Sequence, residues 1–105
     1  SDTLTLDLSF WKKIRKQAGD HNKYPALIFK STDNNSVVFL EKGLLDYSNF
    51  KVVEQIVPRT NFNLSVDEYS SIITSENLPV IVTFLLANKY FVDMIHIEDF
   101  QKTFS

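Results

Sequence analysis

Residues 79–95 read PVIVTFLLANKYFVDMI, two apolar runs separated by a short break. The first run, residues 80–85, follows a proline and has the length and β-branched composition of a buried strand. Ala87-Asn88 is short enough to form a turn, and residues 90–95 return as a second strand. This segment therefore predicts a buried antiparallel hairpin.

A second segment with the same order lies earlier in the chain. Pro25 leads the apolar run 26–29, residues 33–36 supply turn chemistry, and residues 37–40 return as a strand. The β-branched residues of 51–57 predict a further strand, which Pro58 ends because proline has no N–H for the ladder. The sequence thus predicts two hairpins and one additional strand.

Each hairpin is preceded by a short strand, 3–6 or 62–64, and by an amphipathic helix. In the first helix, 8–18, apolar residues keep to one face, Asp7 is the predicted N-cap and Gly19 a left-handed stop. The second helix, 66–74, begins with a capping box formed by Ser65 and Glu68. We also expect one helical turn within 41–47 and a short C-terminal helix over 97–104.

These elements predict a single α/β domain over residues 1–105. Its mixed β-sheet has about six or seven strands and is flanked by two main helices. The halves 1–50 and 51–105 share one element order, with Leu6 matching Leu64 and Pro25 matching Pro79. An internal strand–helix–hairpin duplication explains this order. The alternative is that any two strand–helix–hairpin units would show it.

Composition excludes several classes of protein. The chain has no cysteine, so disulfide scaffolds, thiolate zinc sites and cysteine nucleophiles are absent. It has two glycines, too few for a glycine-rich phosphate loop. No apolar run approaches the roughly 20 residues that span a bilayer, and no signal pattern opens the chain. We therefore expect an intracellular, cytoplasmic protein without a membrane partner.

Positive charge is concentrated near the N-terminus of a chain whose formal net charge is -2. Five cationic residues form the candidate nucleic-acid-binding set: Lys12, Lys13, Arg15, Lys16 and Lys23. On a helix, Lys12, Arg15 and Lys16 share one face, and such a face can neutralise phosphates. The alternative interpretation is an ordinary solvated helix face.

The carboxylate candidates for metal-dependent chemistry are Glu41, Asp46 and Glu54, which lie near predicted strand ends, and Asp93, which lies inside a predicted strand. Phosphodiester cleavage with Mg²⁺ needs two or three such groups together, commonly with a lysine nearby. The diagnostic acid-x-lysine spacing is missing, because Ile56 stands where the lysine would follow Glu54. Neither His21 nor His96 belongs to a cluster in the sequence. We therefore assign no catalytic residue and no metal site, and expect no cofactor unless the chain cuts nucleic acid with Mg²⁺.

The segments 6–18 and 24–29 together resemble restriction-endonuclease-like nucleases, including Holliday-junction resolvases. In that family a helix ending in Gln-Ala, here Gln17-Ala18, is followed by a proline-led buried strand. Residues 62–65 and 78–82 look like the same region again. The resemblance implies a nuclease-like fold and DNA as ligand. The family's catalytic strand precedes the helix, and no matching strand with its acid and lysine is found here.

Three functions are compatible with these observations. The first is a nuclease-related nucleic-acid-binding domain that does not cut as an isolated chain. The second is a protein-interaction module, of phage accessory or immunity type, whose acidic second half meets a basic partner. The third is a Mg²⁺-dependent endonuclease completed by homodimerisation. The first is our leading interpretation.

Overall fold

The computed structural model describes residues 3–30, 36–74 and 77–103. Its elements, in chain order, are β1 (Thr3–Asp7), α1 (Leu8–Asp20), β2 (Ala26–Phe29), β3 (Val37–Glu41), β4 (Lys51–Val57), β5 (Asn61–Ser65), α2 (Val66–Thr74), β6 (Val80–Leu86), β7 (Tyr90–His96) and α3 (Ile97–Thr103). The predicted α/β class is confirmed. The predicted turn at 33–36 and the last helical residue, Phe104, fall largely or wholly outside the described residues.

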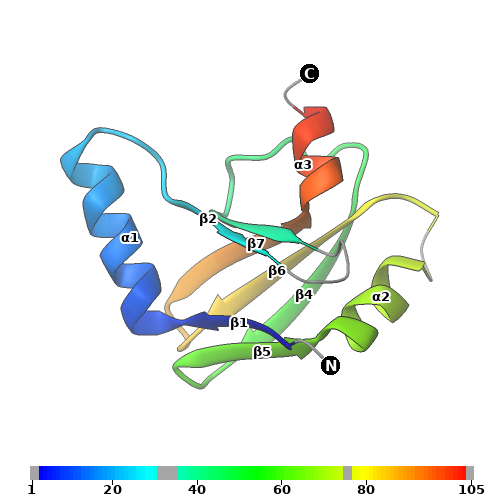
Figure 1. Cartoon of the computed structure of the whole chain (residues 1–105), viewed down its shortest axis with the longest axis horizontal. Coiled ribbons are helices and arrows are strands. Elements are labelled where there is room, and N and C mark those ends of the chain that lie inside the picture. The colour runs from blue at the N-terminus through cyan, green and yellow to red at the C-terminus, as the bar shows by residue number, and fades with distance from the viewer. Residues whose placement is uncertain (1–2, 31–35, 75–76, 104–105) are drawn as a thin grey trace.

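The strands form two sheets rather than one (Figure 1). Five of them make a mixed sheet in the order β2-β3-β7-β6-β4, in which β4 and β6 are parallel and the other pairs antiparallel. The remaining two, β1 and β5, form a separate antiparallel ribbon. The number of strands matches the prediction, but they are divided between two sheets because, among the described residues, β1 and β5 pair with each other and not with the main sheet.

The pairing joins corresponding strands of the two predicted halves. β1 pairs with β5 and β3 pairs with β7, and both pairs are antiparallel. The second strands of the two hairpins thus meet at the centre, with β2 and β6 outside them. A two-fold relation between two strand–helix–hairpin units would give this order.

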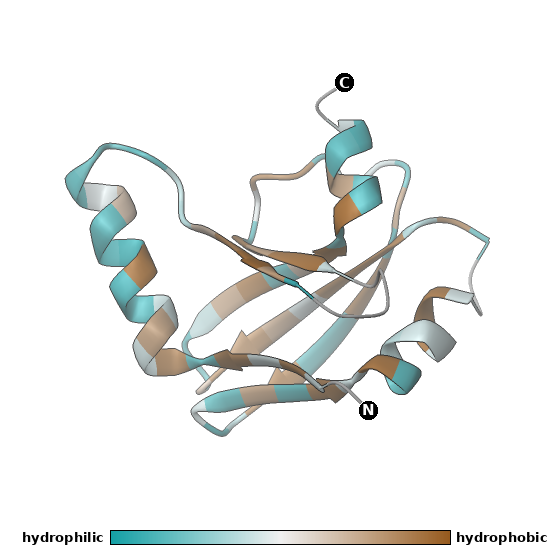
Figure 2. Ribbon diagram, in the orientation of Figure 1, coloured by the Kyte–Doolittle hydropathy of each residue, from teal (hydrophilic) through white to brown (hydrophobic). Residues whose placement is uncertain are grey.

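One face of the five-stranded sheet packs against the ribbon and the two main helices. Alternate residues of β1 and β5 point inward, and Phe62 stacks on Phe84 of β6 with ring centroids 4.0 Å apart. Trp11 of α1 and Tyr69 of α2 are fully buried in the same cluster. Figure 2 shows the apolar residues gathered on the strands, while hydrophilic residues predominate along the part of α1 far from β1.

The local signals for the helices are largely confirmed. The Asp7 side chain accepts a hydrogen bond from the Ser9 N–H (2.8 Å), and Ser65 Oγ accepts one from the Glu68 N–H (3.1 Å). Gly19 is not the left-handed stop we expected. The helix continues to Asp20, and Asn22 instead takes positive φ (56°), since the Lys23 N–H closes the end by donating to the Ala18 carbonyl (2.7 Å).

The second face of the sheet is covered by residues 42–50 and α3. Leu45 is buried here, and Phe50 and Phe100 pack against the cluster formed by Val38, Leu40, Ile81 and Ile95. The predicted helical turn within 41–47 is absent from the helices of the described residues. β3 runs on to Glu41, and Gly43 (φ 96°) redirects the chain instead.

A buried carboxyl holds this covering segment to the sheet. Asp93 is fully buried in β7, where its two oxygens accept hydrogen bonds from Thr83 Oγ1 (2.7 Å) and from the Tyr47 hydroxyl. Burial raises the pKa of Asp93 above its usual range, although both hydrogen bonds act in the opposite direction. Burial and the neighbouring carboxylate also raise the pKa of Tyr47 to about 12.

The raised pKa of Asp93 predicts a pH-dependent contribution to stability. Its stabilising effect is fully present below the unfolded value of 3.8 and is lost as the pH rises through the folded value. Relative to an Asp93→Asn variant, the wild type should therefore gain unfolding free energy as the pH falls from 7 toward 4. Urea denaturation of both proteins across this range measures the difference. Asp7 and Asp46, whose pKa values are lowered, occur in both proteins, so their effect on stability cancels in the comparison. Parallel curves of unfolding free energy against pH would contradict the prediction.

Candidate nucleic-acid interface

The predicted basic residues are brought together by α1 and the segment that follows it. Lys12, Arg15 and Lys16 project from α1 into one open groove, and Lys23 and Tyr24 line the same groove from the connection to β2. Lys13 is exposed on α1 but does not line this groove. Four of the five predicted cations therefore meet.

A second groove adjoins the first and shares Arg15, Glu41 and Tyr90 with it. Its other lining residues include Lys42, Lys89 and Phe91. The order of the strands in the sheet explains why these residues lie together. Antiparallel β3 and β7 place Glu41 opposite Val92, so the end of β3 lies beside the start of β7. The Lys42 N–H continues this pairing by donating to the Phe91 carbonyl (3.4 Å).

The two grooves together form what we call the α1–β7 face. Within the described residues it contains six cations, one carboxylate, two exposed aromatic rings and one partly buried ring: Lys12, Arg15, Lys16, Lys23, Lys42, Lys89, Glu41, the exposed Tyr24 and Phe91, and the partly buried Tyr90. The chain has 11 Lys and Arg and 13 Asp and Glu, so five cations and twelve carboxylates are left for the rest of it. The molecule is therefore strongly polarised, although its formal net charge is only -2.

Cations and aromatic rings alternate on this face. The Arg15 guanidinium lies 5.0 Å from the Tyr90 ring centroid, and the ammonium of Lys89 lies 5.5 Å from the same ring. The ammonium of Lys42 lies 4.5 Å from the Phe91 ring. Such contacts hold long side chains over the rings and reduce their freedom. Basic and aromatic groups interleaved in this way are typical of surfaces that contact nucleic acid.

Arg15 differs from the lysines because it already has an anionic partner. Its Nη2 donates to Glu41 Oε1 at 3.0 Å, and the two side chains are 40% and 36% exposed. An exposed pair of this kind contributes roughly 0–1 kcal/mol, so a phosphate could displace the carboxylate at little cost. The sequence did not predict this pair, because its partners are separated by 26 residues.

The candidate carboxylates do not form a metal centre. Glu41 pairs with Arg15, Asp46 accepts from the Ser48 N–H (3.0 Å), and Glu54 lies on the edge strand β4. In residues 3–30, 36–74 and 77–103, no three His, Asp or Glu side chains are placed to hold a metal ion together.

In these same ranges, no helix is long and apolar enough to cross a membrane.

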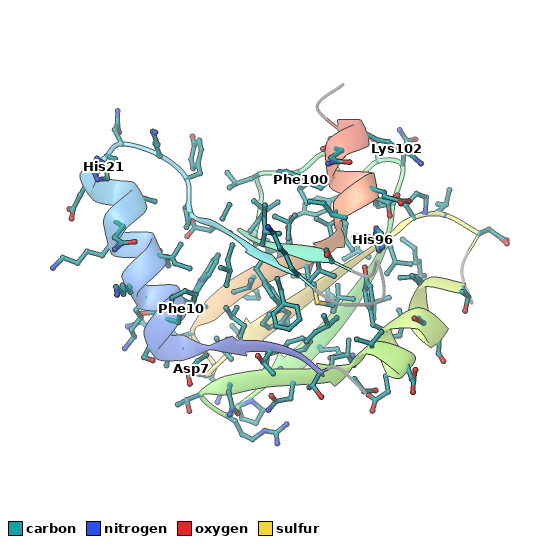
Figure 3. All side chains as sticks on the ribbon, in the orientation of Figure 1. Asp7, Phe10, His21, His96, Phe100 and Lys102 are labelled. Carbon is teal, nitrogen blue, oxygen red and sulfur yellow. The ribbon has the colours of Figure 1, made fainter. Side chains whose placement is uncertain are left out.

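The two histidines have local roles in the fold. His21 is the C-cap of α1, and its backbone N–H donates to the carbonyls of the last helical turn. His96 Nδ1 accepts from the Glu98 N–H (3.2 Å) at the start of α3, and its ring stacks on Tyr69. Figure 3 shows the two side chains well apart, His21 at the end of α1 and His96 near the base of α3.

Comparison of the chain with protein-family models, curated proteins and solved structures gives no match. The assignment of a function therefore depends on the residues of the α1–β7 face.

Proposed function

We propose that this chain binds nucleic acid through the α1–β7 face. One observation carries the proposal. Six of eleven cations gather there around a single carboxylate, among the described residues of a chain that is acidic overall. Lysines that are not paired with carboxylates can neutralise phosphates and release their counterions, which is the main source of affinity in such complexes.

The resemblance to restriction-endonuclease-like nucleases supports the same ligand but not the same reaction. The helix that carries it, α1, supplies Lys12 and Lys16 to the face. The acid-x-lysine pattern that nuclease chemistry requires is missing around Glu54. We therefore propose binding without cleavage by this chain alone.

The first test is binding of the wild-type chain to labelled duplex, single-stranded and four-way-junction DNA. Fluorescence anisotropy is measured from 50 to 300 mM salt, with Ca²⁺ and with Mg²⁺. We expect a binding constant whose logarithm falls against log salt with a slope of about -2 to -3 or steeper, as three or more phosphate contacts would give. Absence of binding at the lowest salt would overturn the proposal and favour a basic protein partner. Cleavage in Mg²⁺ alone would instead favour an enzyme completed by a second copy.

Glu41 provides a prediction that separates binding from catalysis. Replacing Glu41 by glutamine removes the carboxylate of the face and releases Arg15. One additional phosphate contact should raise DNA affinity by up to about 8-fold at 0.1 M salt. Anisotropy titrations of the wild type and Glu41→Gln measure this change. If Glu41 held a catalytic metal, the variant would show lost cleavage and no gain in affinity.

A further inference from the structure

We propose that the α1–β7 face takes single-stranded polynucleotide, with an unpaired base stacked on Tyr24. This inference rests on the proposed function and specifies its ligand. Phosphate contacts alone do not distinguish a duplex from a single strand. The accessible aromatic rings of the face do, because bases expose their flat surfaces only when they are unpaired.

Tyr24 is the most open ring of the face. Its side chain is 75% exposed, and it is the most exposed large apolar or aromatic side chain among the described residues. Within this part of the chain neither another ring nor a cation covers it, whereas Tyr90 and Phe91 both carry cations. An aromatic ring left this exposed has an unsatisfied apolar surface that a base could cover.

Tyr24 is also held in place and surrounded by positive charge. The neighbouring Pro25 is buried and fixes the backbone, so the ring stands on an anchored segment. Tyr24 lines the same groove as Lys12, Lys16 and Lys23. A base stacked on Tyr24 would therefore have its flanking phosphates within the region of these lysines, the arrangement found in single-strand-binding surfaces.

The second groove gives the strand a continuing path. It shares Arg15 and Tyr90 with the first groove and adds Lys42, Lys89 and Phe91. Phe91 is 49% exposed, with Lys42 over its ring. Tyr24 lines only the first groove and Phe91 only the second, so the two grooves together offer rings for bases and cations for the phosphates of one strand.

The test compares three labelled ligands of equal length: a 15-nucleotide thymidine strand, a strand of abasic sites and a duplex. Each is titrated against the wild type, Tyr24→Ala and Tyr24→Phe. We expect the wild type to bind the thymidine strand at least about 5-fold more tightly than the abasic strand. Tyr24→Ala should lose roughly 10-fold on the thymidine strand alone, while Tyr24→Phe retains the wild-type affinity because it keeps the ring. Circular dichroism checks that the variants fold. We expect them to do so, because Tyr24 is exposed and is not part of the core.

The possible results separate this inference from the proposed function. Equal binding of thymidine and abasic strands, or an unchanged affinity of Tyr24→Ala, would overturn stacking but leave phosphate binding intact. Tighter binding of the duplex than of the thymidine strand would also overturn the single-strand inference. Failure to bind any of the three ligands would overturn both proposals.

Discussion

Replacing Phe84 by alanine should lower the free energy of unfolding by about 3–5 kcal/mol. Phe84 is fully buried in β6, where it stacks on Phe62 of the ribbon and meets the edge of Phe39 at a centroid distance of 6.2 Å. It thus joins the two sheets, and its removal leaves a cavity at their interface. Since a domain of this size has roughly 5–15 kcal/mol of stability in total, the substitution should remove a large share of it. Urea denaturation followed by the fluorescence of the buried Trp11 measures the change.

Phe91→Ala is the matched control. Phe91 lies on the adjacent strand β7 but is 49% exposed, so the same substitution should cost less than about 1 kcal/mol. Phe84→Leu, which preserves much of the buried volume, provides an intermediate variant if the alanine variant does not fold. Equal losses at positions 84 and 91 would show that the ribbon does not pack on the sheet through Phe84.

The parts of the fold that depend on neighbouring residues were predictable from the sequence. The hairpin of β6 and β7 follows from its two apolar runs and the Ala87-Asn88 turn. Both turn residues take positive φ, as tight hairpins require. The caps Asp7 and Ser65 also act locally, since each accepts from a residue two or three positions ahead.

The features that were missed depend on contacts distant in the sequence. Pairing of Thr5 with Asn63 separates the ribbon from the main sheet, and no local pattern indicates which strand β1 will choose. Gly19 was misjudged because the helix end is set by the Lys23 N–H bonding to Ala18, which leaves Asn22 in the left-handed conformation. Asp93 was visible as a charge within a strand, but its partner Tyr47 is 46 residues away.

Half of the α1–β7 face likewise could not be predicted from the sequence. The cations of α1 share a helix face and can be recognised from their spacing, whereas Lys42 and Lys89 join them only because β3 pairs with β7. One sequence signal was overlooked. The dipeptide Lys-Tyr occurs twice, at 23–24 and 89–90, and both copies lie on this face. A basic residue beside an aromatic one is a better indication of nucleic-acid contact than charge alone.

Reversing charge at the first groove should have the largest effect on binding. The triple variant Lys12→Glu, Lys16→Glu, Lys23→Glu replaces three exposed cations of this groove without disturbing the Arg15–Glu41 pair. Loss of three phosphate contacts should lower DNA affinity by at least about 100-fold at 0.1 M salt. The slope of log affinity against log salt should fall in magnitude by about 2–3. Both quantities come from anisotropy titrations of single-stranded and duplex DNA.

The control must change the net charge equally, because any added negative charge repels DNA at long range. Lys13→Glu, Lys51→Glu and Arg59→Glu together meet this condition, since all three residues are exposed and none lines the α1–β7 face. If long-range repulsion alone were responsible, both triple variants would bind DNA more weakly by a similar factor. The slope of log affinity against log salt would then also be similar in the two variants. Direct contact predicts a control whose slope stays at the wild-type value. Lys13 makes the comparison strict, because it shares α1 with Lys12 and Lys16 and differs from them in the direction it faces.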